Sequence, residues 1–196
     1  MKPSTKREAY LESTAVVDWK SPPILSLAEQ LASGAKNETE IARRCFEFVR
    51  DQIRHSSDYG LNPVTCRASE VLEHRTGFCF AKSHLLAALC RANSIPSGFC
   101  YQRLVLDEQA GTYCLHGLNA VFLPVHDWYR IDARGNRPGI TADFCPPVER
   151  LAYAADQAGE LHLPEIYAAP RKEIVALSSR SQDVENVVAN LPDLEG

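Results

Sequence analysis

Hydrophobic residues recur at helical spacing in the first half of the chain. After the cap-like run Asn37-Glu38-Thr39-Glu40 they alternate with charged residues, as Ile41, Cys45, Phe48, Val49 and Ile53. This pattern predicts an amphipathic helix. A shorter apolar run from Ile24 to Leu31 stops at Ser33-Gly34 and predicts a helix before it.

A third helix is expected to begin at Cys79. The run Arg75-Thr76-Gly77-Phe78-Cys79 interrupts a short helical segment at 69–73 and leads into small and apolar residues through Arg91. Because Ile95-Pro96 excludes helical backbone before the proline, the helix must end ahead of it. The apolar stripe of this helix predicts a place in the core.

The pattern then changes to strands. Gly98–Leu106 and Leu115–Leu123 are rich in aromatic and branched residues and flank a turn at 109–111, and Trp128–Asp132 predicts a third strand. Further helices are expected near Glu149–Ala155 and around 184–188. Helices followed by sheet indicate an α+β class.

The chain is interpreted as a single domain over residues 1–196. Its core is expected at about 37–156, with an N-terminal arm at 1–23 and a C-terminal extension at 157–196. The apolar residues in both end segments are sufficient for them to dock, either on this core or on a partner, so a homo-oligomer is one option.

Composition narrows the choice of partners. The net charge of −4 gives no long-range attraction to phosphates or anionic lipids, so neither nucleic acid nor a membrane is an expected partner. The polar N-terminus leads into no long apolar stretch, which favours a cytoplasmic location.

Seven cysteines argue against a disulfide framework, because an odd number leaves one thiol unpaired: Cys45, Cys66, Cys79, Cys90, Cys100, Cys114 and Cys145. No Cys-x-x-Cys pair is present. His74 and His84 lie near Cys79 in sequence, but their spacing matches no metal-ligand set. We therefore expect neither a metal nor a cofactor.

Cys79 stands out because it lies where a loop becomes a helix. The unpaired amides and positive dipole end of that helix favour a thiolate, and the same amides can donate to a developing oxyanion. The alternative is a buried core cysteine, which is the commoner role of this residue type.

His116 and Asp132 lie at equal distances from residue 124, inside the loop between two predicted strands. In an antiparallel hairpin such residues face each other about 5 Å apart, so the carboxylate is expected to reach the imidazole. Asp132 would then fix the tautomer and leave the other nitrogen free for a thiol proton. The alternatives are a core histidine and a turn-forming aspartate.

These residues together resemble the transglutaminase-like superfamily of papain-related enzymes. The resemblance covers about residues 40–140 and rests on three motifs: Arg75-Thr76-Gly77-Phe78-Cys79, His116-Gly117-Leu118-Asn119-Ala120 and Trp128-Tyr129-Arg130-Ile131-Asp132. It implies a papain-like fold in which the cysteine helix packs on an antiparallel sheet, and a catalytic triad of Cys79, His116 and Asp132. Ser94 departs from the family, which usually has glycine there.

The implied activity is acyl transfer from an amide or ester, through a thioester on Cys79. Transfer to water makes a peptidase or amidase acting on a peptide, protein or small amide, and this is the preferred prediction. Transfer to an amine makes a transglutaminase or amide-forming enzyme with the same triad. A binding module that has kept the fold, and a thiol redox sensor, are the alternatives from other classes.

Overall fold

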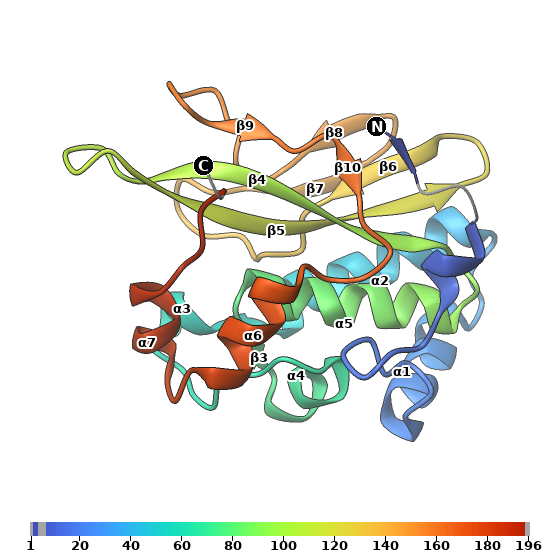
Figure 1. The fold of residues 1–196 in the computed structure, drawn as a ribbon. Helices are drawn as coiled ribbons and strands as arrows, with labels where there is room; N and C mark the ends of the chain where they lie inside the picture. The colour runs from blue at the N-terminus through green and yellow to red at the C-terminus, as the bar shows by residue number, and fades with distance from the viewer. Residues whose placement is uncertain (1, 4–6, 195–196) are drawn as a thin grey trace.

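Helices pack against one face of an antiparallel sheet in the computed structural model, which describes residues 2–3 and 7–194 (Figure 1). The sheet has the strand order β6-β5-β4-β9. Its strands are β4 (Ser97–Asp107), β5 (Thr112–Leu123), β6 (Asp127–Ile131) and β9 (Leu161–His162). The predicted α+β class is confirmed, and the fold is of the transglutaminase-like type.

The predicted helices of the first half are present. They are α1 (Pro22–Ala32), α2 (Glu38–Gln52), α4 (Ala68–His74) and α5 (Cys79–Ala92). The Asn37 side chain accepts the amide of Glu40 at 2.9 Å, as its cap-like position predicts. Short elements between them are α3 (Ser56–Tyr59) and the parallel pair β2 (Arg54–His55) and β3 (Thr76–Gly77).

Helix α5 lies at the centre of the molecule. Every residue from Cys79 to Arg91 is buried, so the helix is enclosed on all sides and not on a single stripe. Gly117 lets β5 approach closely, because a Cβ there would lie 2.6 Å from Cδ1 of Phe80. The side chain of Asn119 donates to the carbonyl of Ser83 at 3.0 Å. The start of α5 is therefore fixed against the middle of β5.

The backbone of Ser94 shows how serine stands where the family usually has glycine. Its φ is 61°, in the left-handed region that favours glycine. Serine adopts this conformation here because α5 still has to end before Pro96. The departure therefore leaves the helix ending unchanged.

The helix predicted near Glu149–Ala155 is wrong. That segment contains β8 (Val148–Arg150), which pairs with β7 (Asp143–Cys145), followed by irregular backbone. Glu149 accepts two bonds from the guanidinium of Arg130, at 2.6 and 3.0 Å. These long-range contacts override the local helical pattern.

Both end segments pack on the domain. The N-terminal part contributes β1 (Lys2–Pro3) and the 3-10 helix η1 (Arg7–Leu11), and β1 pairs with β10 (Glu165–Ile166). The C-terminal part contributes α6 (Lys172–Arg180) and α7 (Val184–Ala189), which join the main core through Ile174, Leu177 and Val187. Figure 1 shows α7 next to α3, on the helical side of the molecule.

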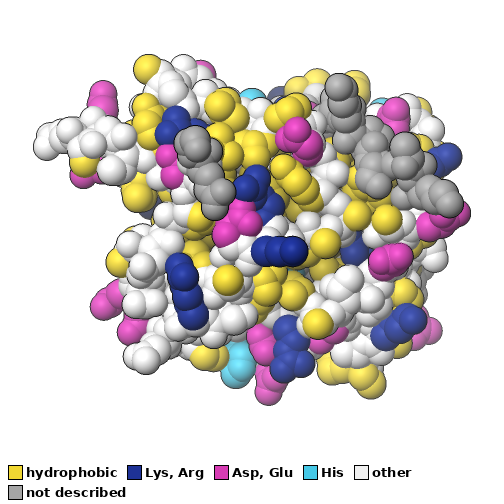
Figure 2. Space-filling view, in the orientation of Figure 1, with side chains coloured by type: hydrophobic (Ala, Val, Ile, Leu, Met, Phe, Trp, Pro, Cys, Tyr) yellow, Lys and Arg dark blue, Asp and Glu magenta, His cyan; other side chains and the backbone are white. Residues whose placement is uncertain are grey.

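The face of the molecule shown in Figure 2 carries no continuous stripe of basic side chains. Figure 2 shows Lys and Arg side chains interspersed with Asp and Glu, and hydrophobic side chains gathered near its middle. None of the described helices has the length and apolar character needed to cross a membrane.

Arg91 ties the two ends of the chain to α5. Its buried guanidinium donates to the carbonyls of Glu12, Ser97 and Ala168, at 2.6 to 3.1 Å. Each acceptor lies on a different segment, so one side chain joins the N-terminal arm, the start of β4 and the C-terminal extension.

We predict that Arg91→Met lowers the free energy of unfolding by about 3 kcal/mol, because buried carbonyls lose a charged donor. Urea unfolding of the intact protein measures this change. The control is Arg43→Met, at an exposed position of α2 paired with Glu47, where an effect below about 0.5 kcal/mol is expected. Equal stability of the two variants would contradict the role of Arg91.

Candidate active site

Cys79 is the first residue of α5, as the sequence predicts. Strand β3 ends at Gly77 and pairs with β2, which fixes the backbone just before the cysteine. A Cβ on Gly77 would lie 3.1 Å from Cβ of Ala81 and 3.2 Å from Oγ1 of Thr65. This close approach accounts for the glycine two residues before the nucleophile candidate.

The amides at the start of α5 remain free for an anion. Phe78 occupies the cap position, has no side-chain acceptor, and its carbonyl accepts the first helical bond from Lys82 at 2.9 Å. The amides of Cys79, Phe80 and Ala81 therefore have no partner within the helix. Together with the helix dipole, they favour negative charge at the Cys79 sulfur or on an oxygen beside it.

His116 and Asp132 are in contact. Nε2 of His116 donates to Oδ2 of Asp132 at 2.8 Å, and both side chains are buried. The expected position directly opposite is wrong by two residues, because the β5–β6 pairs are centred on residue 125 and their register would place residue 134 opposite His116. Strand β6 ends at Ile131, so Asp132 lies beyond the last pair and reaches His116 diagonally.

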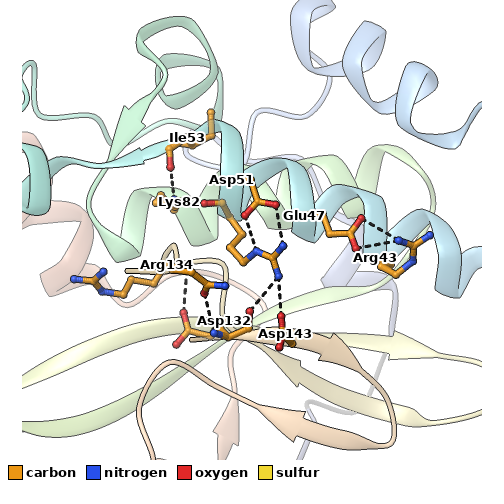
Figure 3. Close-up of polar contacts among 11 residues, drawn as sticks. Arg43, Glu47, Asp51, Ile53, Lys82, Asp132, Arg134 and Asp143 are labelled. Carbon is orange, nitrogen blue, oxygen red and sulfur yellow. Dashed lines mark hydrogen bonds and ion pairs between the residues drawn. The ribbon is translucent and has the colours of Figure 1, made fainter. Parts of the chain in front are cut away.

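Asp132 is held by two backbone amides as well. Oδ1 accepts from the amide of Arg134 at 3.1 Å, as Figure 3 shows, and Oδ2 accepts from the amide of Ala152 at 3.2 Å. Burial alone would raise the pKa of Asp132, but His116 and these amides outweigh it and hold the pKa below its usual value. The carboxylate is therefore charged and fixed in orientation.

The electrostatics of His116 favour the protonated ring. Burial lowers its pKa, but the Asp132 carboxylate and the Cys79 thiol, each by charge and by hydrogen bonding, together raise it to about 10. Because Nε2 is bonded to Asp132, Nδ1 is the nitrogen left for the sulfur. The structure thus brings the three predicted residues Cys79, His116 and Asp132 together.

Tyr153 is a site residue that the sequence did not indicate. Its ring stands edge-on to the His116 ring, with centroids 4.9 Å apart. It follows β8, in the segment expected to be helical, so no local signal marks it. The ring covers one side of the imidazole and restricts its rotation.

A partly buried ion pair supports the turn after Asp132. The guanidinium of Arg134 makes two bonds to Asp58, at 2.6 and 2.8 Å. The Asn136 side chain accepts the amide of Ala142 at 2.8 Å. Arg134 and Asn136 therefore hold the turn, and Arg134 also links it to α3.

Lys82 is a second residue whose role the sequence does not indicate. Its buried ammonium bonds the carbonyl of Ile53, just after α2, and lies 3.5 Å from the carbonyl of Arg50 (Figure 3). Burial and the nearby Arg134 lower its pKa to about 7, against the opposing effect of Asp132. A lysine one helical turn after Cys79 thus anchors the end of α2 to the cysteine helix.

The described residues contain no group of three or more His, Cys, Asp or Glu arranged to hold a metal ion. All seven cysteines are free thiols.

A family model for the transglutaminase-like superfamily matches residues 25–133, more than half of the chain. The chain belongs to the transglutaminase-like superfamily. The matched range runs from α1 to the residue after Asp132 and includes all three candidate residues. A search of curated proteins found no significant match.

Solved structures share this transglutaminase-like fold. A candidate cysteine protease from Cytophaga hutchinsonii matches 83% of this chain and 53% of its own, with 17% identity and a TM-score of 0.54. The periplasmic domain of TgpA from Pseudomonas aeruginosa matches 65% of this chain and 46% of its own, with 19% identity and a TM-score of 0.48.

Red sea bream transglutaminase matches 64% of this chain and 31% of its own, with 10% identity and a TM-score of 0.45. The chain therefore spans about half or less of the length of these proteins. At such identities the similarity is one of fold.

We predict that Asp132→Asn lowers the pKa of His116, because burial then outweighs the remaining favourable interactions. Imidazole resonances followed by NMR should show wild-type His116 protonated at pH 8 and the variant neutral. Asp143→Asn, which removes an exposed partner of Arg50, should leave the titration of His116 unchanged.

The raised pKa of His116 makes the stability of the fold depend on pH. A folded-state pKa near 10 lies above the unfolded value of about 6.5, so the His116 interaction stabilises the fold fully below about pH 6.5 and is lost as pH rises towards 10. The free energy of unfolding should therefore fall less over this range in Asp132→Asn than in the wild type. Identical pH profiles would contradict the assigned His116–Asp132 interaction.

Proposed function

We propose that this protein is a cysteine-dependent acyl-transfer enzyme with Cys79 as nucleophile, His116 as proton carrier and Asp132 as the residue that orients the histidine. The observation that carries the proposal is the buried 2.8 Å bond between His116 and Asp132, with Cys79 interacting with the same imidazole at a helix start. Family membership and the Cytophaga structure support the broader statement that the protein is a cysteine-dependent enzyme.

The reaction begins with His116 protonated, the proton of the Cys79 thiol having moved to Nδ1, so that the sulfur is a thiolate. The thiolate adds to an amide or ester carbonyl, and the carbonyl oxygen takes the negative charge, which the free amides at the start of α5 stabilise. Nδ1 then returns its proton to the departing amine as the C–N bond breaks. A thioester on Cys79 remains.

The acceptor that takes the acyl group from the thioester defines the class of enzyme. We favour water as the acceptor, since water is present in every case. His116 removes a proton from that water, and the carboxylic acid leaves as the thiolate forms again. Peptides, proteins and small amides all fit this reaction as substrates. Transfer to a primary amine is the alternative with the same residues.

We expect iodoacetamide to label Cys79 in the folded protein by a reaction that depends on His116, because the thiolate is the reacting form. The rate of labelling should fall by at least about tenfold in His116→Ala. Peptide mapping by mass spectrometry assigns the modified residue and separates Cys79 from the partly exposed Cys114 and Cys145. Cys145 serves as the internal control, and its rate should be the same in both proteins.

Equal labelling of Cys79 in the wild type and in His116→Ala would reject the triad. It would leave a binding module on the same fold as the better explanation. Preferential conversion of Cys79 to a disulfide by mild oxidant, with no acyl-enzyme from any ester, would instead favour a redox role.

A second experiment separates hydrolysis from transfer. The enzyme is incubated with a library of activated esters and amides, with and without a primary amine such as glycine methyl ester. We expect acid products in both cases and no amide containing the added amine. Formation of that amide at the expense of the acid would show that transfer is the reaction.

A further inference from the structure

The nucleophile candidate is covered in this structure. Cys79 is 3% exposed and His116 is 5% exposed. An amide substrate must reach both residues, so some segment has to make room for it. We call Leu191–Leu194 the C-terminal tail. Its contacts with the strand that carries His116 make it the candidate for that segment.

The tail docks on a free edge of β5. Strand β6 pairs only with residues 119–123 of that strand, which leaves the earlier part of this edge unpaired by β6. There the amide of Leu115 donates to the carbonyl of Pro192 at 2.7 Å. Leu191 and Leu194 pack against the main hydrophobic core on either side of this bond. The bonded residue, Leu115, immediately precedes His116.

An ion pair holds the tail in register. Nε and Nη2 of Arg103 bond the two carboxylate oxygens of Asp193, each at 2.7 Å. The guanidinium lies 3.6 Å above the ring centroid of Tyr113 and also donates to the carbonyl of Gly159 at 3.0 Å. This planar, two-pronged arrangement recognises a carboxylate specifically. Arg103 is directly opposite Leu115 in the β4–β5 pairing.

Cys114 links the tail to the nucleophile. Burial raises the pKa of the Cys114 thiol to about 11, and the charges of Cys79 and Asp193 both add to this rise. Cys114 therefore lies within range of the electrostatic effects of both Cys79 and Asp193. Figure 1 shows the last segment of the chain rising from the last helices towards β5 and β4 of the sheet.

We propose that the tail occupies the position of an extended peptide substrate, and that Arg103 selects substrates that carry an acidic side chain. A peptide would add to the free edge of β5 through the Leu115 amide, as strand-adding ligands do. The tail is then an internal competitor that lowers the reactivity of the enzyme. This inference rests on the function proposed above and specifies its substrate class.

The strength of the contacts suits such exchange. The side chains of Arg103 and Asp193 are 22% and 32% exposed, and ion pairs open to solvent are weak. Apart from the packing of two leucines, the tail is held by one backbone bond and one ion pair. A substrate that makes the same bonds can therefore replace it.

The test compares the rate at which iodoacetamide labels Cys79 in the wild type and in three variants. These are the wild type, a protein ending at residue 190, Asp193→Asn, and Glu47→Gln as a control at a distant ion pair. We expect labelling at least fivefold faster after removal of the tail, a smaller increase for Asp193→Asn, and no change for Glu47→Gln. Thermal unfolding, measured in parallel, confirms that each protein is folded.

Addition of peptide gives a second measurement. An acetylated peptide with the sequence of residues 190–196 should protect Cys79 in the shortened protein, whereas the same peptide with asparagine for Asp193 should protect it at least fivefold less well. The double variant Arg103→Asp with Asp193→Arg should recover the slow labelling of the wild type, because the ion pair forms again in reverse. This rescue does not depend on the shortened protein being folded.

The outcomes separate this inference from the proposed function. If labelling depends on His116 but neither removal of the tail nor Asp193→Asn accelerates it, the tail is only a structural element and the inference is overturned. Equal protection by the two peptides would reject the role of Arg103. Labelling that is independent of His116 in every variant would instead overturn the triad itself.

Discussion

The structure depends on the complete burial of α5. A helix enclosed on all sides cannot tilt or rotate without disturbing every element around it, because protein interiors are close-packed. Its first residue is Cys79. The position of the nucleophile candidate is therefore set by the packing of the whole domain, together with the β2–β3 pair before it. The free amides of the first turn are fixed by the same constraint.

Burial also requires partners for the polar side chains of α5. Lys82, His84 and Arg91 each donate to backbone carbonyls of other segments, respectively the end of α2, Cys66 before α4, and three segments around the start of β4. Charged groups inside a protein are tolerated when they are bonded in this way. These bonds connect the cysteine helix to parts of the chain far away in sequence.

Much of this arrangement could be predicted from the sequence, because it depends on local signals. The break before Cys79, the ending before Pro96 and the alternating strands each have a local physical cause. The exact register of the β5–β6 hairpin does not: the turn is centred on residue 125, so the His116–Asp132 contact is diagonal. Tyr153 and Lys82 carry no signal, since their roles come from contacts with residues distant in sequence.

A covered site suits this chemistry. A thiolate and an imidazolium attract each other more strongly when water is excluded, and so does a developing oxyanion with the amides at the helix start. In the mechanism proposed above, the acceptor that releases the thioester must nevertheless enter, and it must do so while the acyl group is still attached. If the substrate replaces the tail along β5, the acyl chain covers the same edge during the reaction. In the proposed reaction the acceptor then has to arrive by another route, and the shape of that route decides between water and an amine.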